Sequence, residues 1–163
     1  MNPFDDALIA SYGSAYINFG ADTPLKYGGG NAMSLTATVL LSSLNSDAYI
    51  AHKYEVLNFG TIGGNRLYAS LGGAAKNIQG KPDLVADTYY QVALVYDGTT
   101  LTIYREGKED ASGTDWPEGA NTKPLLLGLD LATNTPVPGL TLSRIGIWNR
   151  ALTPEEIQQI ANS

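Results

Sequence analysis

The sequence predicts an all-β protein, a sandwich of two antiparallel sheets with one short helix at its C-terminal end. Three observations support this fold class. Apolar residues alternate along many short segments, 18 glycines and 8 prolines help to separate those segments, and helical spacing appears only after residue 152. Short alternating segments divided by turns are typical of sandwiches and barrels.

Strand candidates follow one another along the chain, each bounded by Gly, Asn, Asp or Ser. They cover residues 14–20, 34–43, 47–60 and 65–73, and later residues 123–131 and 140–148. In the last segment the alternation shifts by one position between Leu142 and Ile145. This shift predicts a β-bulge or strand break near Ser143 and Arg144.

The clearest local structure is the segment YYQVALVYDGTTLTIYREGKED, residues 89–110. Val92, Leu94 and Tyr96 alternate with Ala93 and Val95, and Asp97-Gly98 then provides a turn. The alternation resumes, and Glu106-Gly107 provides a second turn. Two successive hairpins predict an antiparallel meander with one apolar face.

The C-terminal segment carries a complete set of helix-start signals. Thr153 is placed as an N-cap, Pro154 as the first helical residue, and Glu156 as the partner of Thr153 in a capping box. Leu152 and Ile157 have the spacing of a hydrophobic staple. Because a helix of about two turns is marginal by itself, its apolar side, with Ile157 and Ile160, must pack on the sandwich.

Composition narrows the classes of partner. The chain has 163 residues, as expected for one domain, and carries ten Lys and Arg against sixteen Asp and Glu, a net charge of −6. Without a basic run, nucleic acid is not an expected partner. No apolar run approaches the ~20 residues that span a bilayer, so we expect no membrane insertion. The chain has no cysteine, which excludes disulfides and thiolate sites.

Three segments resemble laminin-G-like domains of the concanavalin A-like lectin/glucanase superfamily. YQVALVYDGTTLTIYREGKED resembles the central hairpin, LSRIGIWNRALTPEEIQQIA the closing strand and helix, and AYINFGADTPLKY the opening strand. The resemblance runs from about Ala15 to Ala161. It implies a jelly-roll sandwich, one domain over residues 1–163, in which the helix is a closing element and Trp148 a core residue.

The resemblance also implies a possible enzyme, because relatives of this kind include glucanases and alginate lyases. A glucanase site needs two carboxylates on one face of a strand, and therefore two acids at positions i and i+2, separated by one residue. The acids here are adjacent instead, as in Asp5-Asp6 and Glu155-Glu156, and the lyase pattern Gln-x-His is missing. His52 is the sole histidine. The sequence therefore predicts no glycoside hydrolase or polysaccharide lyase activity.

The expected ligand-binding residues concentrate between Asp47 and Ser70. Aromatic faces with amide and hydroxyl groups suit sugars, although tyrosine also packs half-buried strand positions for structural reasons. Trp116 precedes a proline in a polar segment, so we expect it to be exposed at a contact surface. The candidate binding residues are Tyr49, His52, Tyr54, Asn58, Asn65, Tyr68 and Trp116.

The resemblance also implies a candidate calcium site, because such sandwiches often bind calcium in acidic loops. Asp22, in FGADTP, stands where these relatives place an acidic loop. Ser143 stands where calcium-binding relatives often have Asp, and a single carboxylate is a thin ligand set. Calcium at Asp22 is therefore a candidate only, and a simple turn at this position is favoured.

Two functions from different classes fit these observations. The first is a non-catalytic, lectin-like recognition module that binds a glycan or serves adhesion. The second is a structural decoration, cement or tail-associated protein of a bacteriophage virion. The segment MNPFDDALIASYG carries acids where a secretion signal has basic and apolar residues, and a phage needs no such signal. We expect an extracellular or virion-surface location, with glycans or protein subunits as partners.

Overall fold

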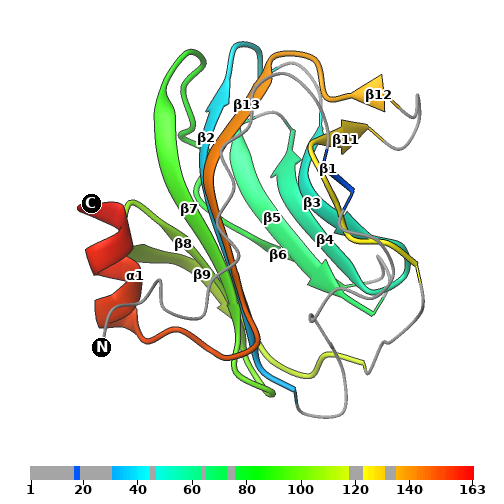
Figure 1. The fold of residues 1–163 in the computed structure, drawn as a ribbon, viewed down its shortest axis with the longest axis vertical. Helices are drawn as coiled ribbons and strands as arrows, with labels where there is room; N and C mark the ends of the chain where they lie inside the picture. The colour runs from blue at the N-terminus through cyan, green and yellow to red at the C-terminus, as the bar shows by residue number, and fades with distance from the viewer. Residues whose placement is uncertain are drawn as a thin grey trace.

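The computed structural model describes residues 17–18, 31–44, 47–63, 65–72, 76–117, 123–130 and 135–163. Two antiparallel sheets face one another across an apolar core (Figure 1). This arrangement, with one short helix near the C-terminus, confirms the expected fold class. A further pair of short strands, β11 (Leu129–Asp130) and β12 (Thr135–Pro136), lies beside the sandwich.

The first sheet has five strands in the order β13-β2-β7-β8-β9. Its pairs are antiparallel, and β2 joins two strands that are distant from it in sequence. The strands are β2 (Met33–Leu41), β7 (Tyr89–Tyr96), β8 (Leu101–Arg105), β9 (Lys108–Gly113) and β13 (Leu140–Trp148).

The second sheet has six strands in the order β1-β10-β3-β4-β5-β6. A short strand from late in the chain, β10, is inserted between β1 and β3. The strands are β1 (Ile17–Asn18), β3 (Ala48–Lys53), β4 (Leu57–Ile62), β5 (Arg66–Leu71), β6 (Ile78–Gln79) and β10 (Leu126–Leu127).

The predicted meander forms β7, β8 and β9, and both faces of β7 are buried. Val92, Leu94 and Tyr96 face the core between the sheets, whereas Ala93 and Val95 face the opposite side. This explains why β7 reads VALVY without a polar face, in contrast to the single apolar face that the sequence predicted for the meander.

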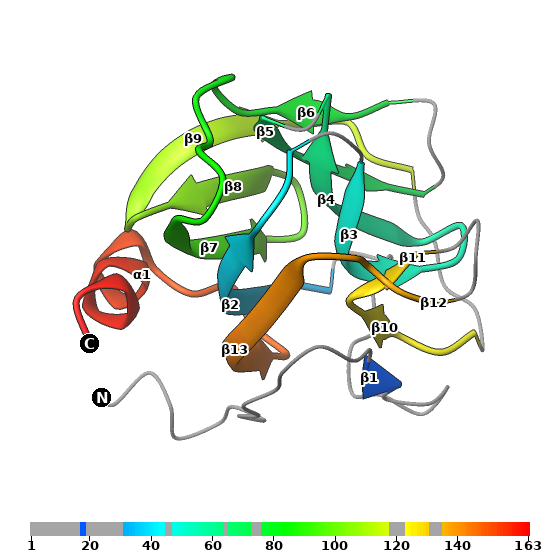
Figure 2. The ribbon, with the colours of Figure 1, turned by 90° about the horizontal axis from the view of Figure 1, so that it is seen from above.

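The opposite side of the five-stranded sheet is covered by α1 (Pro154–Ala161). Figures 1 and 2 show the helix on the side of this sheet that faces away from β3, β4 and β5. Its buried residues join a second apolar cluster made of Ala93, Val95, Tyr104, Trp148, Leu152, Ile157 and Ile160. Trp148, 1% exposed, is thus a core residue as expected, but of this second cluster.

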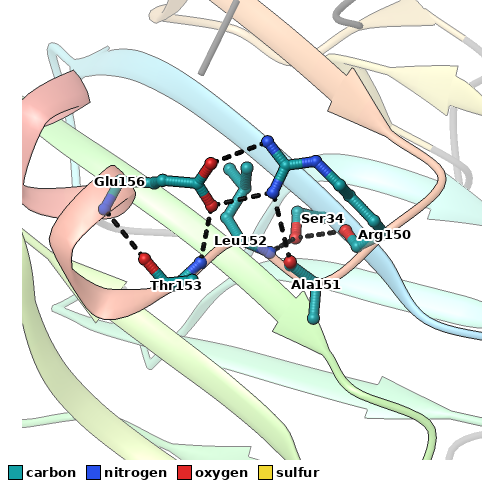
Figure 3. A network of polar contacts seen from close by, with 6 residues as sticks. All are labelled: Ser34, Arg150, Ala151, Leu152, Thr153 and Glu156. Atoms are coloured by element: carbon teal, nitrogen blue, oxygen red, sulfur yellow. Dashed lines mark hydrogen bonds and ion pairs between the residues drawn. The ribbon is translucent and has the colours of Figure 1, made fainter. Parts of the chain in front are cut away.

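The predicted capping box is present, and it is tied to the sandwich (Figure 3). The Thr153 hydroxyl accepts from the backbone N–H of Glu156 at 3.3 Å, and Glu156 Oε2 accepts from the N–H of Thr153 at 2.8 Å. The hydroxyl of Ser34 on β2 donates to the carbonyl of Arg150 and accepts from the N–H of Leu152, both at 2.9 Å. The connection into the helix is therefore fixed to β2 at Arg150 and Leu152.

The predicted bulge in β13 is confirmed. The register against β2 shifts between Ser143 and Gly146, and Arg144 has a φ of 50°. Beyond the bulge, the indole of Trp148 lies over Gly146. A Cβ on Gly146 would come within 2.2 Å of Trp148 Cη2, so the ring occupies the space of a side chain.

Two of the segments that were each expected to form one strand contribute to two strands instead. Residues 47–60 form β3 and part of β4, joined by a turn in which the N–H of Val56 donates to the carbonyl of Lys53 at 2.9 Å. Glu55 takes a left-handed conformation there, φ 55°, without the glycine that usually marks it. Residues 123–131 likewise contain β10 and β11, separated at Gly128, φ 72°.

Candidate functional site

The candidate site lies on the outer face of the six-stranded sheet. Leu57 and Phe59 on β4, and Leu67 and Ala69 on β5, point into the core. Because side chains alternate along a strand, the intervening residues point outward. Asn58, Tyr68 and Ser70 are these intervening residues.

On β3, a register shift brings two of the predicted residues to this same face. Tyr49 lies opposite Gly60 and His52 opposite Asn58, although three positions separate Tyr49 from His52. The extra residue lies between Tyr49 and Ala51. Gly60 permits the bulge, because a Cβ there would lie 2.0 Å from the carbonyl oxygen of Ala48.

Three aromatic rings, two on β3 and one on β5, pack edge to face across β4. The ring centroids of Tyr49 and His52 are 5.5 Å apart, and those of Tyr49 and Tyr68 are 6.3 Å apart. Burial raises the pKa of the Tyr68 hydroxyl, and the neighbouring Tyr49 raises it further. The Tyr68 hydroxyl is therefore neutral, and the ring contacts fix the orientation of both tyrosines.

A polar chain runs beside the rings. The Asn58 side-chain amide donates from Nδ2 to the Ser70 hydroxyl at 3.1 Å, and its Oδ1 lies 2.7 Å from His52 Nδ1. In this orientation, assigned from the network, the amide oxygen is an acceptor, so His52 Nδ1 carries the proton and donates. Burial lowers the pKa of His52, and the bond to Asn58 partly offsets this effect.

A pocket of about 260 Å³ opens beside His52. Tyr54, 55% exposed, belongs to the turn after β3, and Leu126 on β10 lies directly opposite His52 in the strand register. The residues that line the pocket are His52, Tyr54, Lys123, Pro124 and Leu126. Its walls are mostly apolar, and an apolar wall with a few polar groups is the usual form of a small-molecule site.

Lys53 holds one wall of this pocket in place. Its side chain is buried, and its Nζ donates to the carbonyl oxygen of Lys123 at 2.6 Å. Burial lowers the pKa of Lys53. The bond links the end of β3 to the segment that leads into β10.

Five of the seven predicted binding residues lie together at this site. They are Tyr49, His52, Tyr54, Asn58 and Tyr68. Sequence reasoning missed Ser70, Lys123, Pro124 and Leu126. No local signal identified the last three, because they reach the site only through the pairing of β10 with β3.

Two predicted residues lie elsewhere. Asn65 sits in the turn between β4 and β5, where its Nδ2 donates to the carbonyl of Pro82 at 3.3 Å, a structural contact. The expected exposure of Trp116 is wrong: the ring is half-buried against the core, and its Nε1 donates to the carbonyl of Gly113 at 2.7 Å. The Lys76 ammonium lies 5.2 Å from the ring centroid and covers it further.

A second hollow, of about 320 Å³, is lined largely by charged residues around β8 and β9. Arg105 pairs there with Asp83 and Asp110, and its guanidinium lies 5.9 Å from the Tyr90 ring centroid. Gly80 packs so closely on the Asp110 carboxylate that a Cβ would lie 1.9 Å from Oδ2. These contacts fix the segment between β6 and β7 to the sheet.

Neither a metal centre nor a membrane span is found in the described part of the chain. Among these residues no three or more His, Asp or Glu side chains form a group that could hold an ion. Asp22 lies outside the described residues, so calcium there stays a prediction. Within the same ranges no helix is both long and apolar enough to cross a bilayer.

Comparisons with known proteins agree with this architecture. A family model described as the concanavalin A-like lectin/glucanases superfamily matches residues 11–158. A search of curated proteins finds no significant match to the sequence.

Several solved structures share the fold. A putative carbohydrate binding protein from Bacteroides ovatus has a TM-score of 0.73 at 16% identity, over 94% of this chain and 46% of that one. The CBM40 of the Ruminococcus gnavus IT-sialidase, bound to α2,3 sialyllactose, has a TM-score of 0.69 at 12% identity, over 96% of each chain. Domain 4 of an extracellular arabinanase from Geobacillus stearothermophilus, with arabinotriose, has a TM-score of 0.69 at 22% identity, over 95% and 76%.

The present chain therefore spans about half the length of the Bacteroides ovatus structure. At these identities the likeness establishes the fold.

Proposed function

The chain belongs to the concanavalin A-like lectin/glucanases superfamily, and from this premise we propose that it is a non-catalytic glycan-binding module. The module spans residues 1–163 and acts outside cells. Similar structures include a putative carbohydrate binding protein, a sialyllactose complex and an arabinotriose complex, and these relatives support this class of ligand.

The observation that carries the proposal is the pocket beside His52. An exposed aromatic ring, Tyr54, and the apolar Leu126 offer surfaces for the C–H face of a sugar ring. His52 supplies a polar atom in the same wall. At about 260 Å³ the pocket is slightly below the ~300–1,000 Å³ common for drug-sized ligands, which suits one sugar unit at the end of a glycan.

The same residues argue against catalysis. The five residues that line the pocket include no carboxylate, whereas glycoside hydrolysis needs two. The Nδ1 partner of His52 is the amide of Asn58. An amide cannot stabilise an imidazolium as the carboxylate of a catalytic triad does.

A pair of exposed tyrosines provides a matched test. Tyr54, 55% exposed, lines the pocket, and Tyr89, 62% exposed, begins β7 on the other sheet. On a glycan array, Tyr54→Ala should lose most of the binding, while Tyr89→Ala should bind like the wild type. Both variants should keep the wild-type melting temperature, since neither ring is buried.

The array also separates this function from its alternative. A protein that ignores every saccharide but assembles with itself or with virion proteins would be a structural component, and the glycan-binding proposal would be wrong. Equal losses in the Tyr54 and Tyr89 variants would place the binding surface elsewhere.

A further inference from the structure

His52 has one ring nitrogen without a partner. The side chain is 6% exposed, and Nε2 is buried with no hydrogen bond. The other nitrogen, Nδ1, is held by Asn58 at 2.7 Å. A buried polar atom without a partner is uncommon and costly, and it calls for an explanation.

The polar chain behind the ring determines what Nε2 can do. Ser70 accepts from the Asn58 amide nitrogen, so the Asn58 oxygen faces His52 and receives the Nδ1 proton. A neutral imidazole with its proton on Nδ1 has a lone pair on Nε2. The unpartnered atom is therefore a hydrogen-bond acceptor.

His52, which carries this acceptor, lines the pocket. It is one of the five residues that line the pocket, beside the exposed side chains of Tyr54 and Lys123. A ligand that packs on the Tyr54 ring therefore lies against the same wall as His52. Sugar hydroxyls are donors of suitable size for a single unpaired acceptor in an otherwise apolar wall.

We propose that His52 Nε2 accepts a hydrogen bond from a hydroxyl group of a neutral sugar, and that protonation of Nε2 abolishes this binding. The inference rests on the proposed function and specifies its ligand chemistry. A sugar carboxylate at this position meets the opposite situation, because carboxylate oxygens only accept hydrogen bonds and would be repelled by the Nε2 lone pair. A glycan that places its carboxylate there would need the protonated ring.

The two ligand classes therefore respond to pH in opposite directions. Burial holds the pKa of His52 below its ordinary value of 6.5. A neutral sugar should bind fully above that range and lose about tenfold in affinity for each pH unit below the pKa. An acidic sugar that needs the imidazolium should bind more tightly as the pH falls.

The other titratable groups around His52 are few. Tyr49 packs on the ring from β3, Tyr68 packs on Tyr49 from β5, and Tyr54 and Lys123 share the pocket. Lys53, the next residue on β3, has a pKa lowered by burial, so the experiment must separate it from His52.

Two substitutions at His52 make that separation. The side-chain amide of Gln reaches toward the position of Nε2 and does not titrate, whereas that of Asn reaches only toward the position of Nδ1. His52→Gln should retain binding and lose its pH dependence. His52→Asn should keep the contact with Asn58 but lose binding by tenfold or more.

The experiment is calorimetric titration of the full chain between pH 4.5 and 8, with arabinotriose and neutral array sugars as probes and sialyllactose as the acidic probe. Melting curves at each pH confirm that the protein is folded. A pH dependence that persists in His52→Gln would assign the effect to Lys53 and overturn the inference. So would tighter binding at low pH, or equal binding by both variants.

Failure of the underlying function is distinguishable from failure of this inference. If no saccharide binds at any pH, the glycan-binding proposal itself is wrong, and the role of Nε2 falls with it. If sugars bind through Tyr54 with no effect of His52 or pH, the module is a lectin and only this inference is wrong.

Discussion

Arg150 and Glu156 are joined by two parallel hydrogen bonds, from Nη1 to Oε2 at 2.8 Å and from Nη2 to Oε1 at 2.7 Å (Figure 3). Glu156 Oε2 also accepts from the backbone N–H of Thr153. One carboxylate thus completes the capping box and ties the helix to the loop before it. Bidentate arginine–carboxylate pairs are among the stronger contacts at a protein surface.

This pair predicts a stability loss in acid. Arg150 holds the pKa of Glu156 below its ordinary value of 4.5, so the folded state favours the ionised form. The stabilisation is present above pH 4.5 and is lost as the pH falls through the lowered pKa. Urea unfolding at pH 7 and pH 3.5 should show a smaller pH effect in Glu156→Gln than in the wild type.

Glu155→Gln is the matched control for that measurement. Glu155 is the preceding helix residue and is exposed. Its substitution should leave most of the acid sensitivity intact. If both variants behaved alike, the effect would come from the charge of the helix start and not from the pairing with Arg150.

Loss of the N-cap should destabilise the protein without affecting binding. The Thr153 hydroxyl accepts from the N–H of Glu156, and replacing such a cap with alanine typically costs about 0.5–2 kcal/mol. The helix lies on the five-stranded sheet, while the pocket lies on the other sheet. Thr153→Ala should therefore unfold at lower urea concentration and retain wild-type glycan affinity. Loss of binding by a folded variant would extend the site to the helix.

Gly146→Ala should be destabilising because of Trp148. The new methyl group would lie 2.2 Å from Trp148 Cη2 and 2.6 Å from Cζ3, so the indole must shift. Overpacking of this kind costs about 1–3 kcal/mol. In a Trp148→Phe background, which lacks these atoms, the additional cost of Gly146→Ala should be smaller. A double-mutant cycle by urea unfolding measures this coupling, and additive costs would exclude it.

Asn58→Asp should move the pH dependence of binding upward. A carboxylate at the position of the Asn58 amide oxygen would lie beside His52 Nδ1, now 2.7 Å from that oxygen. An adjacent negative charge raises the pKa of a histidine because it favours the imidazolium. Binding of a neutral sugar should therefore be lost at a higher pH than in the wild type. An unchanged midpoint in a folded variant would mean that His52 is not the titrating group.

Much of the fold was predictable because its signals are local. The shift of parity around Ser143 and Arg144 marks the bulge, and Thr153 and Glu156 mark the start of the helix. Both signals depend on residues that lie only a few positions apart in the sequence. The turn at Glu55 was not predicted, because no glycine marks its left-handed conformation in the sequence. The pairing of β3 with β4 imposes that conformation.

The candidate site was predictable only in part. Tyr49 and His52 share a face because of a bulge, which their spacing alone does not indicate. Asn65 is close to these residues in sequence, but the turn directs its side chain to Pro82. Trp116 was misplaced because its indole N–H finds a carbonyl only three residues away, which draws the ring inward. Proximity in sequence is thus a weak guide to proximity on a sheet.

The pairing of β10 with β3 couples ligand affinity to the integrity of the whole chain. The two walls of the pocket come from the neighbourhoods of His52 and Leu126, and the bond from Lys53 to Lys123 spans 70 residues. No fragment that ends before β10 can assemble the pocket. A bound sugar should therefore slow proteolysis at sites throughout both sheets, since only the complete native state retains the ligand.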